Sequence, residues 1–458
     1  MKRKSRLNPY ALVLLSFAII ILLGSILLVM PWAQGSGQWA WNNYFDALFT
    51  ATSATCVTGL SVYHSGIKDE LSIGGQIVLL AMIQIGGLGF ITVLAFFITL
   101  FKSKLQFKDR YFLSQAVNST NVGDVVRFVR KIIVISFSIE LVGTLVGLPV
   151  FITMFPNNLG MAIWNSIFTC ISAFNNAGFD ILGNTSLIHE AGTLVGSLPN
   201  WANIYLDIYV MILIVAGGIS FLVLTDIFSF KKRPEQWRAF TKIVLLTTSF
   251  LIVIGFVWFL GFECFKGSES MTPLDAIFQS ITCRTAGFST YNQNNLSIGS
   301  KIFSCVLMFI GGSPLGTAGG IKTTTLFMII LAIFSYLRGK NVSAFKRTYS
   351  TKMIVKAMSL FFIAILTVII CFIIISTLEQ SQNIPSENIL FEVFSAFGTV
   401  GLSTGINPDL SVGSKSILIF LMFAGRLGPM TFFQVFQINM NKEGSAHYKY
   451  VEEDFLIG

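Results

Sequence analysis

Four short segments of the chain end in a glycine and share a pattern of small and apolar residues. Aligned on that glycine, they read FTATSATCVTG (49–59), FTCISAFNNAG (168–178), IFQSITCRTAG (277–287) and FEVFSAFGTVG (391–401). A large apolar residue follows each glycine. Successive backbone carbonyls can point at one axis only where some residues take φ > 0, which glycine adopts at little cost. Because rings of such carbonyls replace the hydration shell of a permeating cation, the four segments predict a selectivity filter.

The predicted filter residues are the last four of each segment. They are Cys56, Val57, Thr58 and Gly59; Asn175, Asn176, Ala177 and Gly178; Arg284, Thr285, Ala286 and Gly287; and Gly398, Thr399, Val400 and Gly401. The side chains differ between the segments, so equivalence is expected of the backbone alone. We expect Arg284 to brace its loop by bonding to carboxylates or carbonyls, because a cation pathway would not place a cation on its axis.

The elements that must position these segments are membrane helices. The 458 residues are 53% hydrophobic and only 12% charged, whereas an ordinary soluble domain carries roughly 25% charged residues. A bilayer core needs ~20 apolar residues of helix, and eight runs meet that need. They lie at 11–31, 76–101, 132–155, 203–227, 243–262, 302–336, 355–377 and 415–436. We interpret the first run as a retained span rather than a secretory signal, and the chain as an integral membrane protein.

The charges of the loops indicate how the spans are oriented. Eight spans place both termini on one side, and most of the 31 basic residues fall on that side, in 2–6, 102–131, 231–242, 338–356 and after 436. By the positive-inside rule this side is the cytoplasm. The opposite loops are rich in Asp and Glu, and they either concentrate cations at the outer face or are ordinary solvated loops. The net charge of +9 is thus explained without a nucleic-acid partner.

Each glycine segment lies between two spans and is too short to cross the membrane, which is typical of re-entrant helices. We predict an all-α polytopic membrane protein in which four tandem units of span, re-entrant pore helix, glycine loop and span surround one pseudo-fourfold pore. The units are predicted at 1–110, 111–235, 236–345 and 346–436, followed by a cytoplasmic tail at 437–458. Irregular backbone at membrane depth is tolerated where it lines a watery cavity, which favours a pore.

Polar and small residues interrupt some of the spans. Five glycines and a proline within 311–320 predict a break in the sixth span, either as a kink at a helix contact or as a flexible loop that faces the pore. Arg426 lies within the eighth span, where a charge costs at least ~2.5–3.5 kcal/mol, so it faces the cavity or pairs with backbone carbonyls. Lys322 is expected to reach the cytoplasmic interface. Glu140 and Asp207 either pair with a neighbouring helix or touch a second cation.

These residues make the chain similar to the Trk/Ktr/HKT superfamily of potassium transport proteins. The resemblance runs from the first span to the last and includes the strings GGSPLGTAGGIKTTT (311–325) and AGRLGPMT (424–431). With no additional pair of helices before the first unit, the chain looks most like the Ktr-type membrane subunit. The resemblance implies potassium selectivity, because all four filter positions are glycine. It also implies an intramembrane gate with Arg426 as an electrostatic barrier. The gate residues are Gly312, Ser313, Pro314, Gly316, Thr317, Gly319 and Gly320.

The resemblance further implies partners: a homodimer that sits on a cytosolic ring of nucleotide-binding regulatory subunits, in a bacterial plasma membrane. The basic segments 102–131, 231–242 and 338–356 then either meet anionic lipid or dock that ring. No cofactor is expected in the chain. We expect K⁺ as the transported ion and Na⁺ as a candidate activator, with passive uptake that the partner gates. A sodium-coupled potassium symporter on the same scaffold is the alternative.

The sequence lacks the motifs of a membrane enzyme. No G-x-x-x-x-G-K-[ST] string that would hold ATP occurs, and the three histidines are isolated, so no H-E-x-x-H site exists. The six cysteines have no C-x-x-C spacing and are expected to be buried apolar side chains. A membrane enzyme is therefore the less favoured class, and we expect gradient-driven movement of an ion without catalytic residues.

Overall fold

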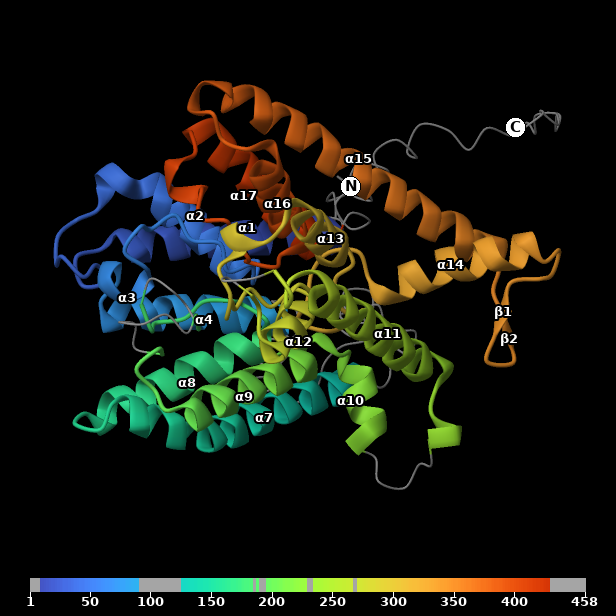
Figure 1. Cartoon of the computed structure of the whole chain (residues 1–458), viewed down its shortest axis with the longest axis horizontal. Coiled ribbons are helices and arrows are strands. Elements are labelled where there is room, and N and C mark those ends of the chain that lie inside the picture. The colour runs from blue at the N-terminus through green and yellow to red at the C-terminus, as the bar shows by residue number, and fades with distance from the viewer. Residues whose placement is uncertain are drawn as a thin grey trace, which may run out of the picture.

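The structure, a computed structural model, describes residues 9–89, 125–183, 187–188, 195–228, 234–266 and 270–428. Helices dominate this part of the chain (Figure 1). Its two named strands form a small antiparallel hairpin, β1 (Ser343–Ala344) and β2 (Arg347–Thr348). The predicted all-α class is confirmed for the described residues.

The helices follow one another in four groups. The first group is α1 (Pro9–Val29), η1 (Trp41–Asn43), α2 (Tyr44–Thr55), α3 (Ile67–Glu70) and α4 (Ile73–Leu88). The second is α7 (Val125–Met154), α8 (Leu159–Asn175), α9 (Asn200–Gly218) and α10 (Phe221–Phe228). The third is η2 (Pro234–Gln236), α11 (Ala239–Phe262), α12 (Pro273–Thr282), η3 (Gln293–Asn295), α13 (Ile298–Phe309) and α14 (Thr323–Leu337). The fourth is α15 (Thr351–Leu378), η4 (Gln380–Gln382), α16 (Ser386–Gly398), η5 (Asn407–Asp409) and α17 (Val412–Leu427).

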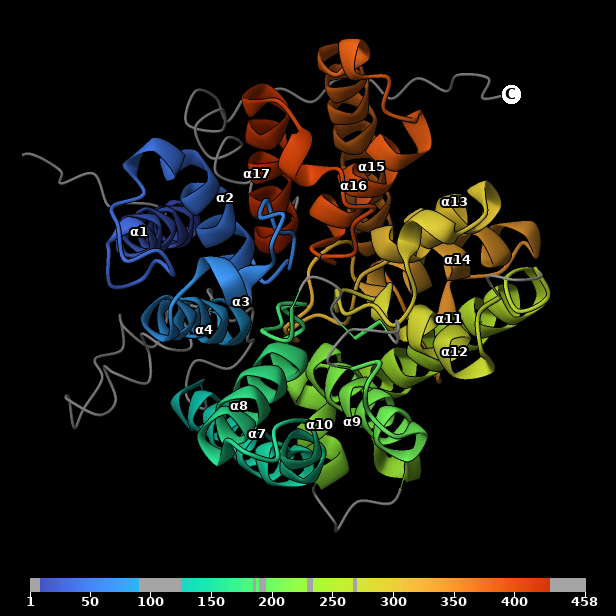
Figure 2. The same ribbon diagram turned by 60° about the vertical axis from the view of Figure 1, so that its left-hand side comes forward.

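The four groups surround a central region that receives their loops. Figure 2 shows them in turn as blue, green, yellow and orange to red ribbons around that region. Helices of adjacent groups pack together, with α4 against α8, α9 against α12, α13 against α16 and α17 against α2. The last of these contacts joins the fourth group to the first, so the groups form a closed ring.

Four of the described helices are long and apolar enough to cross a membrane. They are Val129–Met154 within α7, Asn200–Gly218, Ala239–Phe262 and Thr351–Leu378. Shorter apolar helices lie at Val13–Val29, Ile73–Leu88, Ile298–Phe309 and Thr323–Leu337. Large apolar side chains face outward on the long helices, such as Leu141 on α7 and Phe362 on α15, each 65% exposed. A soluble protein rarely exposes such surfaces, and they are those of a multi-pass membrane protein.

The second helix of each group is short and largely buried; we call α2, α8, α12 and α16 the central helices. Several of their ends are capped. α12 begins with a capping box in which Thr272 and Asp275 accept from each other's backbone N–H groups. At the opposite ends of α8 and α16, Asn176 and Thr399 adopt the left-handed conformation. These caps satisfy the terminal backbone groups, so helices of this length can stop within the protein.

The break predicted in the sixth span is confirmed. α13 ends at Phe309 and α14 begins at Thr323, with irregular backbone between them. The interpretation of 203–227 as one span is wrong, because α9 ends at Gly218 and α10 begins at Phe221. Ser220 lies at this break, where its carbonyl oxygen accepts from the N–H groups of the first turn of α10.

Two further helices end earlier than the predicted spans. α4 ends at Leu88 and α17 at Leu427, and the glycine that follows each has a positive φ, 80° and 79°. A positive φ departs from helical geometry, and glycine adopts it at the lowest cost. The predicted continuations at 90–101 and 429–436 lie outside the described residues, as do the predicted boundary at 110–111 and the tail at 437–458.

We call α4, α9, α13 and α17, which follow the central helices along the chain, the closing helices. Polar side chains near the start of three of them bond to the next group. The contacts are Trp164 Nε1 to Gln76 Oε1 (2.7 Å), Lys301 Nζ to Asn388 Oδ1 (2.9 Å) and Lys415 Nζ to Asp46 Oδ1 (3.3 Å). Each of these helices begins at a serine N-cap, and the bonding residue lies four positions later. The same position therefore carries the contact between groups three times.

Candidate functional site

The four glycines of the aligned segments lie just beyond the central helices; we call Gly59, Gly178, Gly287 and Gly401 the ring glycines. Their φ angles are 97°, 70°, 83° and 94°. Residues other than glycine rarely adopt such φ angles. The prediction that these positions have a positive φ is confirmed in all four loops.

Each ring glycine contacts the loop of the next group. A Cβ atom added to a ring glycine would lie closer than 3.0 Å to a carbonyl oxygen of the neighbouring loop in every case. The oxygens, in the order of the ring glycines, belong to Ala177, Ala286, Val400 and Thr58. The contacts thus pass from the first loop to the fourth and back to the first. The four loops form a closed ring that has no space for a side chain at these positions.

The residue two positions before each ring glycine also has a positive φ. These residues are Val57 (57°), Asn176 (59°), Thr285 (75°) and Thr399 (51°). Positive φ at alternate residues turns successive carbonyl groups toward the same side, as a carbonyl-lined ion pathway requires. These residues belong to the predicted filter, but the sequence did not indicate their positive φ because none of them is glycine.

Side chains of the central helices hold the loops in place. The Ser53 hydroxyl accepts from the N–H of Gly59, and the Ser395 hydroxyl accepts from the N–H of Gly401, both at 3.1 Å. In the second loop Ser172 donates to the carbonyl oxygen of Phe179 at 2.5 Å. The third loop has Thr282 in this role, which donates to the Phe288 carbonyl oxygen at 2.6 Å. Each loop is therefore tied to its own helix by a hydroxyl.

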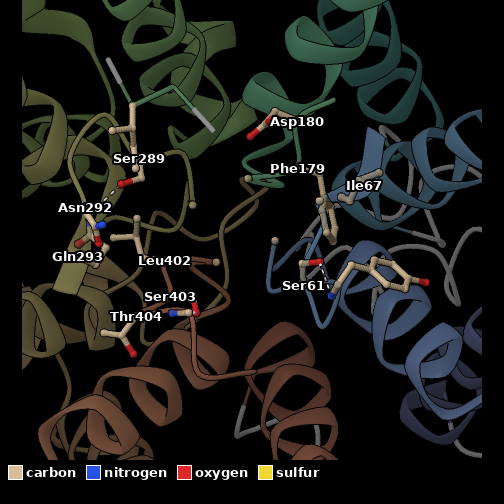
Figure 3. A pocket seen from close by; sticks show the side chains of 18 of the residues that line it. Ser61, Ile67, Phe179, Asp180, Ser289, Asn292, Gln293, Leu402, Ser403 and Thr404 are labelled. Carbon is tan, nitrogen blue, oxygen red and sulfur yellow. Dashed lines mark hydrogen bonds between the residues drawn. The ribbon is translucent and has the colours of Figure 1, made fainter. Parts of the chain in front are cut away.

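All four ring glycines line one side of an open cavity of about 420 Å³. Figure 3 shows that its walls come from all four groups, with Ser61, Asp180, Ser289 and Ser403 among the labelled lining residues. The lining near the ring combines small polar side chains with Phe179 and Leu402, which follow two of the ring glycines. A hydrated cation could enter this vestibule and meet the carbonyls of the loops beneath it.

Several hydroxyls of the ring loops make no hydrogen bond within the described part of the chain. They are those of Thr58, Thr285 and Thr399, all fully buried. Buried hydroxyls are normally satisfied, and each of these three belongs to a residue of the predicted filter.

Two of the predicted filter side chains bond to surrounding elements. The Arg284 guanidinium donates to the carbonyl oxygens of Thr248 (3.1 Å) and Gly311 (3.2 Å), so it braces the third loop through carbonyls, as expected. Asn175 donates to Gln84 Oε1 (2.8 Å) and to the Ile171 carbonyl oxygen (2.9 Å). The backbones of the predicted filter converge, whereas these two side chains bind to neighbouring helices.

The irregular segment 310–322, which we call the interrupting loop, contains all the predicted gate residues except Arg426. It packs against the end of α9, where the N–H of Ser313 donates to Gly218 (3.2 Å) and that of Thr317 donates to Gly217 (3.3 Å). A Cβ on Gly319 would collide with the Thr399 side chain of the fourth ring loop. The interrupting loop therefore lies directly against the ring.

Arg426, in the last turn of α17, connects the interrupting loop to the first group. Its guanidinium donates to the carbonyl oxygens of Thr317, Gly86 and Gly87, the last at 3.1 Å. Of the two alternatives for Arg426, the pairing with backbone carbonyls is observed, and one of these carbonyls belongs to the interrupting loop. Its role as a barrier stays a prediction. The structure brings Arg426 and the predicted gate residues together.

The expectation that Lys322 reaches the cytoplasmic interface is wrong. Its Nζ instead donates to the carbonyl oxygens of Ala318 (2.6 Å) and Gly319 (3.5 Å). The interrupting loop has no helical partners for these oxygens, and the nearby ammonium satisfies them. Lys322 is thus part of the loop's own support.

Glu140 on α7 is 4% exposed and pairs with neighbouring helices. Gln84 on α4 donates to both of its carboxylate oxygens (2.8 and 3.0 Å), and Asn175 Nδ2 lies 3.4 Å from one of them. The carboxylate is therefore bonded to the residue that precedes the second ring loop. Asp207 on α9 lies elsewhere, in the wall of an outer cavity that also contains Asp275.

Sequence reasoning also missed a second glycine repeat. The strings IGGLG (85–89), AGGIS (216–220), IGGSP (310–314) and AGRLG (424–428) occupy equivalent ends of the closing helices. A Cβ on Gly86, Gly217 or Gly425 would overlap the carbonyl oxygen of Thr55, Phe174 or Phe397, each four residues before a ring glycine. These glycines let the closing helices approach the ends of the central helices. In the fourth string, Arg426 replaces the second glycine.

The arrangement suits ion coordination by oxygen atoms of the backbone. Among the described residues, no group of three or more His, Cys, Asp or Glu side chains could hold a metal ion. The six cysteines form no disulfide, and all but Cys264 are buried. The expectation of no cofactor in the chain stays a prediction.

Residues 35–448 match the profile of the family described as TrkH, cation transport protein. The chain is 36% identical to the potassium/sodium uptake protein NtpJ of Enterococcus hirae, over 99% of this chain and 98% of that protein. It is 33% identical to the Ktr system potassium uptake protein B of Bacillus subtilis, over 97% of this chain and 96% of that protein.

The fold is similar to that of a solved structure. The potassium transporter TrkH from Vibrio parahaemolyticus superposes with a TM-score of 0.69 at 17% sequence identity. The match covers 95% of this chain and 86% of that chain, so the two share a fold along nearly their whole length.

Proposed function

The chain belongs to the TrkH family of cation transport proteins, and on this basis we propose that it takes up potassium across a bacterial plasma membrane. The family consists of transporters rather than enzymes. One observation carries the proposal: the closed ring of four loops, each with a positive-φ glycine in contact with a carbonyl of the next loop.

The filter in this proposal is the set of residues 56–59, 175–178, 284–287 and 398–401. Carbonyl oxygens of the four loops replace the water around K⁺ as it leaves the vestibule. The C-terminal ends of the central helices, which carry partial negative charge, point toward the ring and favour a cation. Glycine at all four ring positions leaves the carbonyls unobstructed.

The gate in this proposal is the interrupting loop, which Arg426 holds in the closed position. The loop packs against the fourth ring loop, and its glycines allow it to change conformation at low cost. Arg426 bonds the loop to Gly86 and Gly87, and its positive charge opposes the passage of a cation. Opening then requires these bonds to the loop to break or rearrange.

A homodimer on a cytosolic ring of nucleotide-binding regulatory subunits completes the proposal. The support is the similarity to the Ktr system potassium uptake protein B. The basic segments that would face the cytoplasm offer a surface for such a ring. In this arrangement the regulatory ring controls the gate, and Na⁺ is a candidate activator.

A sodium-coupled potassium symporter is the second candidate. It is favoured by the name of one relative, a potassium/sodium uptake protein. Coupled transport predicts a reversal potential that depends on the gradients of both ions, whereas a potassium filter alone predicts dependence on K⁺. Measuring reversal potentials at fixed K⁺ and varied Na⁺ separates the two.

The filter is tested by uptake of potassium into liposomes that contain the purified protein, with sodium as competitor. Gly59→Ser places a side chain against the Ala177 carbonyl oxygen, and it should lower the preference for K⁺ over Na⁺ by about tenfold, equivalent to ~1.4 kcal/mol. Gly37→Ser is the matched control, because Gly37 also has a positive φ, 67°, but has no atom within 4 Å of an added Cβ.

The Gly59→Ser and Gly37→Ser variants both place a side chain at a residue with positive φ, so both have the same kind of backbone strain. Only the side chain at position 59 contacts the ring. Unchanged selectivity in the Gly59→Ser protein would place the filter elsewhere. Equal loss of selectivity in both variants would assign the effect to general strain. Absence of selective potassium uptake by the wild-type protein, with its cytosolic partner added, would contradict the proposed function itself.

A further inference from the structure

A cavity of about 510 Å³ lies outside the ring loops, between three helices and the hairpin. α14 packs against α15, α11 and β1, and the hairpin projects beside α14 at the right of Figure 1. The lining residues are Ala239, Phe240, Ile243, Thr324, Thr325, Phe327, Met328, Arg347, Tyr349, Met353, Lys356, Ala357 and Leu360. None of them belongs to the predicted filter or gate.

Two cations lie on the wall of this cavity. Arg347 on β2 and Lys356 on α15 are both exposed, and neither forms an ion pair with a described acidic residue. The chain contains no Asp or Glu between Asp275 and Glu379. The surrounding segment 338–356 adds further basic residues. The cavity therefore presents uncompensated positive charge, which calls for an anionic ligand.

The rest of the lining is mainly apolar. Phe240 and Ile243 on α11 face Phe327 and Met328 on α14 and Leu360 on α15 across the cavity. α11 and α15 are long and apolar enough to cross a membrane, and the cavity lies at the N-terminal ends of both helices. Apolar walls form no hydrogen bonds with water, whereas they match the apolar surface of an acyl chain. The volume of the cavity is within the ~300–1,000 Å³ of typical ligand sites.

We propose that this cavity binds an anionic phospholipid. The headgroup phosphate bonds to Arg347 and Lys356, and one acyl chain lies along the apolar walls. Basic pockets between membrane helices bind anionic lipid headgroups in this way. The combination of two cations with an apolar cavity favours a whole lipid over a free phosphate, which would leave the walls uncovered.

The site is adjacent to the interrupting loop. Thr324 and Thr325 line the cavity in the first turn of α14, which follows the loop directly. The N–H of Thr323 donates to the Gly312 carbonyl oxygen at 3.1 Å, and the N–H of Thr325 donates to that of Lys322 at 2.9 Å. A bound lipid would therefore fix the start of the helix that follows the loop.

The test is native mass spectrometry of the purified full chain in detergent, titrated with phosphatidylglycerol or with phosphatidylcholine of the same acyl chains. Phosphatidylglycerol should bind the wild type at least about tenfold more tightly than phosphatidylcholine. The double variant Arg347→Gln with Lys356→Gln should lower the affinity for phosphatidylglycerol by roughly 10- to 30-fold, which is the effect expected from removing two charges near a lipid headgroup. Arg338→Gln with Lys340→Gln is the matched control, since these residues are exposed and do not line the cavity; it should change binding less than about twofold.

Two further arms identify the ligand. Ala239→Phe narrows the cavity and should weaken both lipids, while glycerol phosphate, which has the headgroup charge without acyl chains, should not compete with phosphatidylglycerol. Equal affinity for the two lipids, or an equal loss in the control variant, would overturn the site. Efficient competition by glycerol phosphate would make it a phosphate site instead. Binding is measured without transport, so failure here leaves the proposed potassium uptake unaffected.

Discussion

At the scale of single residues, the ring is unusual in holding side chains as well as glycines at positive φ. Val57 and Thr399 are β-branched, and such residues rarely adopt this conformation. Each costs on the order of 1–3 kcal/mol and persists only where the surroundings impose it. The bonds from the central helices and the close fit of neighbouring loops supply that constraint. The filter backbone is therefore set by the assembled ring rather than by local preference.

This explains which site residues could be predicted from the sequence. The ring glycines were predictable because only glycine is cheap at their φ, and four copies made the pattern visible. The positions two residues earlier carry Val, Asn and Thr, of which only Asn often adopts a positive φ, so the shared conformation was not visible in the sequence. The bonds of Lys322 to carbonyl oxygens of the interrupting loop were likewise not predictable, because they depend on the folded conformation of that loop. The roles of the predicted filter and gate residues stay predictions.

Arg426→Ala should raise potassium flux by roughly tenfold, equivalent to ~1.4 kcal/mol, because it removes a positive charge and three bonds that hold the interrupting loop. Flux is measured in liposomes at equal protein content. Arg426→Lys is the control, since it keeps the charge but loses the planar fork of donors. Flux near the wild-type value in the lysine variant assigns the barrier to charge, and flux as high as in the alanine variant assigns it to the bonds. Wild-type flux in the alanine variant would contradict both roles.

Glu140→Ala should destabilise the folded protein by about 1–3 kcal/mol, because it leaves the half-buried amide of Gln84 without its carboxylate acceptor. Glu140→Gln retains an oxygen acceptor and should lose less. The measurement is the midpoint of thermal unfolding in detergent. Asp69→Ala, at an exposed acidic residue of α3, is the control and should change the midpoint little. A midpoint for Glu140→Ala equal to that of the control would show that the network contributes nothing.

At the scale of elements, the sequence predicts the helices better than their ends. The central helices were found because their length and their glycine set them apart from spans. The break after α13 was predicted from crowded glycines and Pro314. The ends of α4, α9 and α17 were not, because one or two glycines within an apolar run are also common in continuous membrane helices. Alignment of the strings 85–89, 216–220, 310–314 and 424–428 would have revealed them.

Gly217→Ala should destabilise the protein by about 1–3 kcal/mol, because the added methyl group overlaps the Phe174 carbonyl oxygen and forces α9 away from α8. Gly261→Ala is the matched control: it also lies in a helix, α11, and its added Cβ would meet no atom within 4 Å. The control should be neutral or stabilising by roughly 0.5–1 kcal/mol, as expected for Gly to Ala in a helix. Thermal unfolding of the two variants under the same conditions makes the comparison. Equal midpoints would mean that the close approach of the two helices is unimportant.

At the scale of the whole molecule, the all-α membrane fold and the family were both predictable, and both are confirmed. A further repeat went unnoticed: LSIGGQ (71–76), LSIGSK (296–301) and LSVGSK (410–415) open three of the closing helices. Its last residue bonds to the next group, and at Lys415 it connects the fourth group to the first. The second group departs from the pattern with LPNWAN (198–203). The predicted boundaries between the four units stay predictions.

The final prediction concerns orientation, with the vestibule outside and the basic ends of α11 and α15 in the cytoplasm. In intact cells, a charged, membrane-impermeant maleimide should label Ser36→Cys, in the exposed loop after α1, but not Lys340→Cys, which is exposed near the hairpin. Lysed membranes should label both. Val134→Cys, on the exposed apolar surface of α7, is the control for a residue that faces lipid and should stay unlabelled in either preparation. Five of the six native cysteines are buried, and Cys264 is replaced by Ser in each protein to lower the background. Labelling of Lys340→Cys but not Ser36→Cys in intact cells would reverse the orientation and place the basic segments outside the cell.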